Sequence, residues 1–256
     1  MNILTELKNE LGYANVTNQY IELAARTFQM DHGKENLQER ARLIGLCVSK
    51  IPEGYTTRIA KGYITGVHSC VEHFLLAYQM LTGSPAHNSK YKPEVDKNRL
   101  IWTLNLCYNN QIPQDVKRLY YVCNYYRLVR NEIAHSGNGS NELRQAKSQL
   151  NNIDDELVKS GVRSRLKAPN DPKELSFDDQ VLFSRAARTL CERIYKDSKY
   201  EWDAVLTYHR NEISSFILLN DSEGKKKARI TNFLSQIYPI NEEDQFFVDS
   251  LQKFVI

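Results

Sequence analysis

Apolar residues recur along this 256-residue chain at intervals of three and four, which is the spacing of one face of an α-helix. The longest such stripe lies within residues 57–81, and its apolar members are Ile64, Val67, Val71, Phe74, Leu75, Tyr78 and Leu81. Alternation of apolar and polar positions, which is typical of strands, appears over no convincing length. Glycine and proline are scarce, with 11 and 7 residues, and gather between the periodic segments. The pattern therefore predicts an all-α fold.

Shorter periodic segments predict further helices on both sides of this one. They cover residues 2–11, 18–28, 35–48, 98–108, 114–135, 142–157, 177–196, 200–219, 224–237 and 241–254. A basic connector that contains prolines, residues 160–173, interrupts the periodicity. We therefore expect a helical domain at residues 1–160, including the N-terminal helices, and a C-terminal helical extension at 161–256 packed on it.

Composition narrows the class of protein. A hydrophobic fraction of 41% with 25% charged residues is ordinary for a folded globular chain, and a net charge of +3 permits an anionic partner without requiring one. The five cysteines include no CxxC pair, which favours free thiols in a reducing compartment over disulfides or a zinc site. No secretory signal or membrane span is visible. These features predict a cytoplasmic protein without a membrane partner.

The densest chemistry falls in residues 120–137, an apolar and aromatic-rich segment. It carries Arg130 and Asn131 near its C-terminal end, and His135 follows about one turn later. Gly137 is the natural residue to end the helix. A guanidinium, an amide and an imidazole therefore gather at one helix end, and this combination suits chemistry at a phosphodiester.

The spacing Arg130-Asn131-x3-His135 at the end of an apolar helix resembles the motif of the HEPN superfamily, whose members include metal-independent ribonucleases. The resemblance covers about residues 57–157. It implies an all-α helical bundle of HEPN type with additional N- and C-terminal helices. It also implies a homodimer with a composite active site, a role as a toxin or anti-phage effector, and control by an antitoxin or another regulatory partner.

The residues themselves support such a reaction on RNA. RNA supplies its own nucleophile, the 2′-OH, so a nuclease has to move protons and stabilise charge at phosphorus. His135 would transfer the proton, since an imidazole titrates near neutral pH. Arg130 would hold the phosphate in a bidentate fork, and Asn131 would orient the imidazole or donate to the phosphate. This endoribonuclease would need no metal or other cofactor, and would leave 2′,3′-cyclic phosphate and 5′-OH ends.

Helix geometry constrains this site. Positions five apart on a helix differ by about 140°, so Arg130 and His135 do not share a face. Either the helix ends before His135 and the loop swings the imidazole back, or a second copy of the chain completes the site.

Three more residues are candidates for supporting roles. Glu72 is a carboxylate on the strongest apolar helix and needs a partner, which would be Arg127 or Arg130, or alternatively His68. Tyr126 would contact substrate, because it belongs to a group of tyrosines that would either stack on bases or form the core. The group is Tyr120, Tyr121, Tyr125 and Tyr126.

Other functions remain open on the sequence. One alternative is a non-catalytic helical module of the same type that binds a nucleotide or RNA, or acts as a dimerisation or adaptor protein. Another is a regulator whose helices from Phe177 onward dock on a partner. The basic runs at residues 163–173 and 225–229 would either steer RNA or form solvated faces. Arg210-Asn211-Glu212-Ile213 repeats half of the motif without its histidine, and we interpret the repeat as chance.

Overall fold

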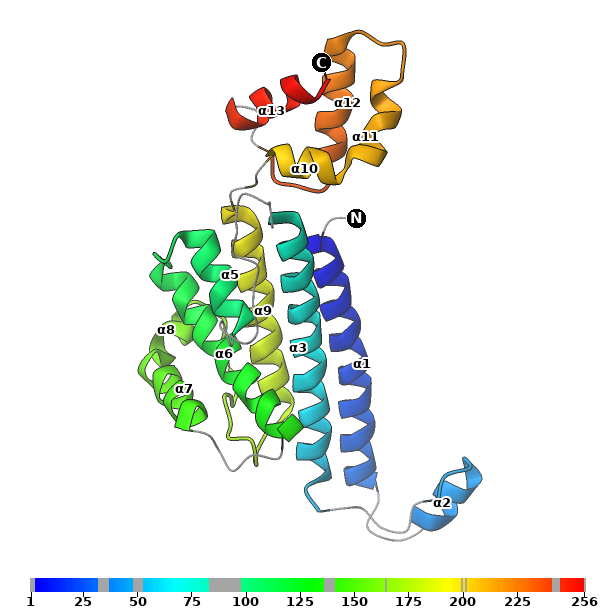
Figure 1. Cartoon of the computed structure of the whole chain (residues 1–256). Coiled ribbons are helices and arrows are strands. Elements are labelled where there is room, and N and C mark those ends of the chain that lie inside the picture. The colour runs from blue at the N-terminus through cyan, green and yellow to red at the C-terminus, as the bar shows by residue number, and fades with distance from the viewer. Residues whose placement is uncertain are drawn as a thin grey trace. The chain divides into compact units, whose positions relative to one another are not determined.

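The computed structural model describes residues 3–31, 37–47, 53–82, 98–135, 141–163, 165–198, 200, 202–240 and 245–255. Within these residues all regular secondary structure is helical, which confirms the all-α prediction (Figure 1). The helices are α1 (Ile3–Asp31), α2 (Leu37–Leu43), α3 (Tyr55–Thr82), α5 (Arg99–Tyr108), α6 (Gln114–His135), α7 (Asn141–Asn152), α8 (Asp154–Lys159), α9 (Phe177–Asp197), α10 (Trp202–Tyr208), α11 (Arg210–Ile217), α12 (Glu223–Ser235) and α13 (Gln245–Val255). The predicted helix end at Gly137 lies outside the described residues.

The first helix differs from the prediction. The two short helices expected at residues 2–11 and 18–28 are one continuous helix, α1, which passes through Gly12. The apolar stripe stops after the buried Leu11 because the next inward position is Asn15. The side chain of Asn15 donates to the Ser184 hydroxyl (3.1 Å) and accepts from the Gln180 amide, both on α9. Along this turn, hydrogen bonds to α9 take the place of apolar contacts. The apolar residues of the sequence therefore do not continue at helical spacing there.

Two other predicted helices are each divided by a single residue. The segment expected at 142–157 breaks at Ile153 into α7 and α8, and the segment at 200–219 breaks at His209 into α10 and α11. His209 has φ −90° and ψ 16°, outside helical values, and its ring nitrogen Nε2 lies 3.0 Å from the Tyr238 hydroxyl. The helix thus breaks at the residue whose imidazole is buried, although the apolar pattern of residues 200–219 continues through it.

The contacts divide the chain into two compact units that interleave along the sequence. Unit 1 comprises residues 1–9, 71–120 and 188–256, and unit 2 comprises residues 10–70 and 121–187. The helices α1, α3, α6 and α9 each contribute residues to both. The borders of the units do not coincide with residue 160, and the expected domain division stays a prediction.

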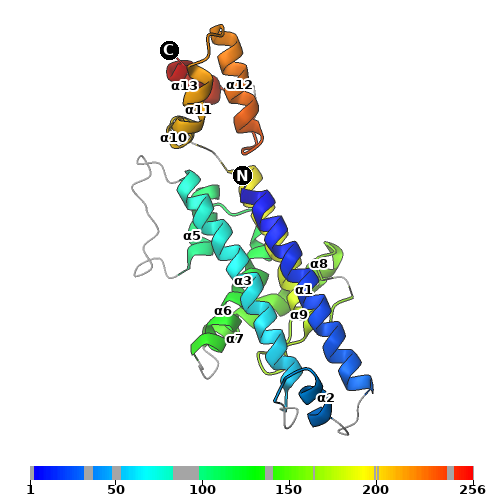
Figure 2. The same ribbon diagram turned by 90° about the vertical axis from the view of Figure 1, so that its right-hand side faces the viewer.

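In unit 2, α1 lies alongside α3 (Figures 1 and 2). The Tyr63 hydroxyl of α3 donates to the Glu22 carboxylate of α1 (3.5 Å), and the Tyr55 hydroxyl donates to the Ala25 carbonyl (3.4 Å). Burial and the neighbouring Glu22 raise the pKa of Tyr63 to about 12, so this phenol stays protonated and remains a donor. These contacts fix which face of α1 is turned inward.

In unit 1, the C-terminal helices pack around aromatic side chains. Rings of α10, α13 and the segments between helices meet at centroid distances of 4.8–6.1 Å, mostly edge to face. The members are Tyr200, Trp202, Tyr238 and Phe247. This cluster gives the region after residue 200 its own buried centre.

Candidate functional site

The helix α6 carries the predicted site and is anchored in unit 2 by its tyrosines. Val122, Tyr125, Tyr126 and Val129 are completely buried, with none of their surface exposed. The Tyr126 ring stacks on Phe183 of α9 at a centroid distance of 5.0 Å. Because these residues recur at helical spacing, the opposite, half-exposed positions of α6 are fixed in direction as well.

The hydroxyl of Tyr126 is hydrogen-bonded to a buried carboxylate. It donates to Oδ1 of Asp179 at 2.9 Å, and Asp179 is itself completely buried. The same carboxylate accepts from the backbone N–H groups of Asn170 (2.7 Å) and Ser176 (2.9 Å). Ser176 precedes α9 and Asp179 is its third residue, so the bond from the Ser176 N–H to the Asp179 carboxylate is the half of a capping box in which the third residue caps the backbone. The hydrogen bonds of Asp179 join α6 to the connector and to the start of α9.

Because Tyr126 is enclosed, it cannot contact a bound molecule, and a role in binding substrate directly is excluded. Tyr125 is equally buried, and its hydroxyl donates to the Asn170 carbonyl at 2.5 Å. Burial raises the pKa of both phenols above the ordinary value. Tyr120 and Tyr121 are half-buried. Of the two alternatives for the tyrosines, base stacking or a place in the core, the structure confirms the core for Tyr125 and Tyr126.

Two arginines of α6 lie on its half-exposed side near the C-terminal end. Nε of Arg127 donates to the Asn124 side-chain oxygen at 3.1 Å, and Nη1 of Arg130 donates to that of Asn131 at 3.3 Å. Among the described residues, no carboxylate lies within ion-pair distance of Arg130. The guanidinium of Arg130 is thus held by a neutral amide and keeps its charge available for an anion.

An imidazole from a different helix lies near these arginines. His68 of α3 is only 8% exposed. Burial, followed by the charges of Arg130 and Arg127, lowers its pKa from 6.5 to about 4. His68 is therefore neutral at pH 7 and lies within electrostatic range of the two guanidiniums, and we call these three residues the arginine–histidine cluster (His68, Arg127, Arg130).

The sequence interpretation missed His68 as a neighbour of Arg130. It considered this residue only as an alternative partner for Glu72. A signal was present, because His68 belongs to the same helical face as the buried Ile64, Val67 and Val71. Its neighbours on α6 depend on how α3 and α6 pack, and no local pattern encodes that.

His135 is the last residue of α6 and is exposed. Since the helix continues through it, the alternative in which the helix ends earlier and a loop swings the imidazole back is wrong. Within the described part of the chain, no hydrogen bond or ring contact joins His135 to Arg130 or Asn131. In a single copy, Arg130 therefore contacts Asn131, acts electrostatically on His68, and makes no hydrogen bond with His135.

Glu72 pairs with Arg99 of α5, whose Nη1 lies 3.1 Å from its Oε2. The expected pairing with Arg127, Arg130 or His68 is therefore wrong. The sequence argument assumed a buried carboxylate, but Glu72 follows the buried Val71 at the margin of the apolar face, and its side chain is 31% exposed. Because Glu72 is partly exposed, its charge needs no arginine from the centre of the fold, and Arg99 on α5 can pair with it.

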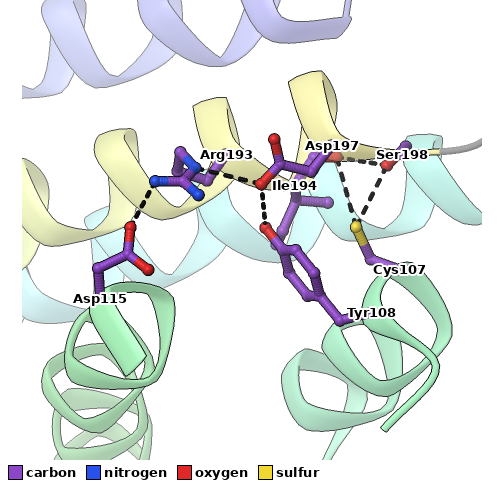
Figure 3. Close-up of polar contacts among 7 residues, drawn as sticks. All are labelled: Cys107, Tyr108, Asp115, Arg193, Ile194, Asp197 and Ser198. Carbon is purple, nitrogen blue, oxygen red and sulfur yellow. Dashed lines mark hydrogen bonds and ion pairs between the residues drawn. The ribbon is translucent and has the colours of Figure 1, made fainter. Parts of the chain in front are cut away.

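A second polar cluster lies in unit 1, where α5, α6 and α9 meet (Figure 3). Arg193 of α9 binds Asp115 at 2.5 Å and Asp197 at 3.2 Å, and the Tyr108 hydroxyl donates to Asp197 at 2.7 Å. Burial raises the pKa of the Cys107 thiol beside them, so this sulfur is not an activated nucleophile. The cluster connects helix ends and has no reactive group.

The basic runs are partly neutralised within the fold. Lys227 of α12 lies 2.5 Å from Glu223, and Arg229 lies 3.0 Å from Asp221. In the connector, Arg163 donates to the Ala168 carbonyl. These contacts favour the solvated or structural interpretation for the paired members of each run.

Among the described residues, no group of three or more His, Cys, Asp and Glu side chains has metal-binding geometry. No helix in the described part of the chain is both long and apolar enough to traverse a bilayer. The fold and the site together define an all-α protein with a cationic cluster near the end of one central helix. Comparisons with protein-family models, curated proteins and solved structures found no match to this chain.

Proposed function

We propose that the protein is a metal-independent endoribonuclease of HEPN type, in which Arg130, Asn131 and His135 act on RNA. Arg127 supports the phosphate contact. The active form is a homodimer in which His135 of one copy works with Arg130 of the other. A role as a toxin or anti-phage effector, restrained by an antitoxin or regulatory partner in the cytoplasm, follows from the same resemblance.

The observation that carries this proposal is the charge arrangement around Arg130. A half-buried guanidinium without a carboxylate partner among the described residues suits an oxyanion better than solvent does, because a phosphate offers it two acceptors at once. Arg127, one turn away on α6, adds a second positive charge. His68 is neutral at pH 7, so the positive charge near the end of α6 comes from the two arginines.

The reaction is an in-line displacement at phosphorus. A general base takes the proton from the 2′-OH, the 2′-oxygen forms a bond to phosphorus, and the bond to the 5′-oxygen breaks. The leaving 5′-oxygen receives a proton from a general acid. Arg130 and Arg127 stabilise the charge that builds on the non-bridging oxygens, and imidazoles carry the protons. The products are a 2′,3′-cyclic phosphate and a 5′-OH.

The test is incubation of purified protein with total RNA in EDTA, followed by mapping of the product ends. We expect cleavage by the wild type and at least a hundredfold loss in Arg130→Ala and His135→Ala, with an unchanged helical content. Arg210→Ala is a matched control, because Arg210 begins the same Arg-Asn-Glu-Ile sequence on α11 and is exposed. Wild-type protein that leaves RNA intact, or a His135→Ala variant that cleaves normally, would overturn the proposal.

A second candidate is a non-catalytic module that binds RNA or a nucleotide through the same cluster. The specific observation in its favour is that His135 is exposed and has no contact with Arg130 within one copy. A module of this kind would retain RNA without producing new ends, would lose affinity in Arg130→Ala, and would keep it in His135→Ala.

A further inference from the structure

The outward face of α1 carries a row of exposed apolar side chains. Tyr13, Val16, Tyr20 and Leu23 are 82%, 53%, 70% and 63% exposed. Their spacing of three, four and three residues places them on one stripe, with the a/d pattern of a coiled coil. Isolated exposed apolar residues are common, but a contiguous stripe of this kind marks an interaction surface. We call these four residues the α1 seam.

The seam is turned away from the rest of unit 2. In unit 2, hydrogen bonds join α1 to α3 and α9 through Asn15, Glu22 and Ala25, which lie on the opposite side of the helix by their spacing. The inner face is therefore already paired within the chain. The seam has no partner among the described residues.

We infer that the α1 seam binds the α1 seam of a second copy of this chain, with the two helices antiparallel. The midpoint of the seam lies at Asn18, so a two-fold axis there places Tyr13 opposite Leu23 of the copy and Val16 opposite Tyr20 of the copy. Each tyrosine then packs on a smaller aliphatic side chain, and every contact occurs twice, as a two-fold interface requires. A large residue thus faces a smaller one along the whole stripe.

Charge supports a copy of the same helix as the partner. The sequence from Leu11 to Ile21 contains no charged residue, so two copies approach without repulsion. A partner recognised through charge would find nothing to pair with on this stretch. Tyrosine is also a residue that interfaces favour, because it buries a large area with little loss of conformational freedom.

The size of the seam agrees with a specific contact. Two tyrosines and two aliphatic side chains with these exposures bury on the order of 500 Å² per copy, or about 1,000 Å² in all, which is the lower range of specific protein interfaces. The expected dimer is therefore reversible, and single charges placed in the seam should dissociate it. The inference rests on α1 alone, and it concerns a different surface from the end of α6, where the proposed ribonuclease would pair its two copies.

The first measurement is the mass of the full chain in solution at tens of micromolar, by light scattering or sedimentation. We expect the wild type to self-associate and Tyr20→Glu to weaken that self-association at least tenfold. Ile21→Glu is the matched control: it places the same charge on the same helix at a position 42% exposed, about 120° away from the centre of the seam. A wild type that stays monomeric, or self-association that Tyr20→Glu leaves unchanged in strength, would overturn the inference.

Cross-linking tests the antiparallel register directly. The exposed Cys47 is first replaced by serine, so that the introduced thiols are the exposed ones among the described residues. In the antiparallel pairing, the double variant Val16→Cys/Tyr20→Cys forms a disulfide-linked dimer on oxidation, while Val16→Cys alone does not. Efficient linkage of Val16→Cys alone means a parallel pairing and contradicts the inference, as does the absence of linkage in the double variant.

Discussion

Replacement of Tyr126 by phenylalanine should destabilise the fold while leaving any chemistry on RNA unchanged. The substitution removes one oxygen atom and keeps the ring that stacks on Phe183. Because the hydroxyl donates to Asp179 and neither residue has exposed surface, no water replaces the lost hydrogen bond. The variant therefore separates a role in the core from a role at the site.

The size of the effect follows from the partner. A hydrogen bond to a charged group contributes about 1.5–3 kcal/mol to stability, roughly twice the contribution of a neutral one. Oδ1 of Asp179 keeps the Asn170 N–H at 2.7 Å, so the carboxylate is not left without donors. We therefore expect Tyr126→Phe to lower the free energy of unfolding by about 2 kcal/mol.

Urea denaturation followed by far-UV circular dichroism measures this loss. Tyr208→Phe removes the same atom from a side chain that is 59% exposed and lies outside the α1 seam, and it should change the free energy of unfolding by less than about 0.5 kcal/mol. RNA cleavage or RNA binding per folded molecule should be the same in Tyr126→Phe as in the wild type. Unchanged stability together with reduced RNA cleavage or binding would refute the core assignment and return Tyr126 to the site.

Three further substitutions test other parts of the structure. The pKa of His68 is about 4 in the folded chain and about 6.5 when unfolded, so the unfolded state binds more protons between these values and stability falls as the pH drops from 7 to 4. Glutamine does not titrate, so in His68→Gln the free energy of unfolding should fall between pH 7 and pH 4 by up to about 3 kcal/mol less than in the wild type. Denaturation curves at the two pH values measure this difference, and an equal pH dependence in both proteins would contradict the burial of the imidazole. Glu72→Gln should lower the free energy of unfolding by no more than about 1 kcal/mol, because its pair with Arg99 is partly exposed, and should leave RNA cleavage unchanged; a strong loss of cleavage would place Glu72 in the site. Gly12→Ala should raise the free energy of unfolding by about 0.5–1 kcal/mol, because Gly12 lies inside α1 and an added Cβ meets no atom within 4 Å. The gain is measured as a higher melting temperature, and a lower melting temperature would contradict a continuous α1.

The helices that were predicted well are those whose apolar periodicity and capping residues lie close together in the sequence. The expected segment 57–81 corresponds to α3, and 177–196 corresponds to α9. Asn98 accepts from the N–H groups of Leu100 and Ile101 and begins α5, as its residue type favours. In these cases periodicity and capping residues lie within a few positions of each other, and tertiary contacts only reinforce them.

The predictions that were wrong depend on contacts between distant residues. Asn15 interrupts the apolar stripe of α1, yet its partners 165 and 169 residues away on α9 make a polar inward position acceptable. The partner of Glu72 was misassigned because Arg99 lies on a helix whose packing no periodicity encodes. His68 was missed as a neighbour of Arg130 for the same reason. Sequence gives the inward and outward faces of a helix, and it does not give what each face meets.

One experiment decides whether the proposed site is shared between two copies or complete within one. Arg130→Ala and His135→Ala are mixed after each has been shown to be inactive alone. If Arg130 of one copy works with His135 of the other, a mixed dimer keeps one intact site, and random pairing restores about a quarter of the wild-type activity. If the site lies within one copy, the mixture stays inactive, because no chain carries both residues.

An inactive mixture would make His68 the next candidate for proton transfer, because Arg130 acts electrostatically on its imidazole within one copy. In that case His68→Gln should abolish cleavage as thoroughly as Arg130→Ala does. If the mixture regains activity and His68→Gln remains active, the second copy supplies the imidazole, and His68 only contributes a buried, neutral neighbour to the guanidiniums. A mixture that regains activity while His68→Gln is inactive would assign proton transfer to both imidazoles, one from each copy.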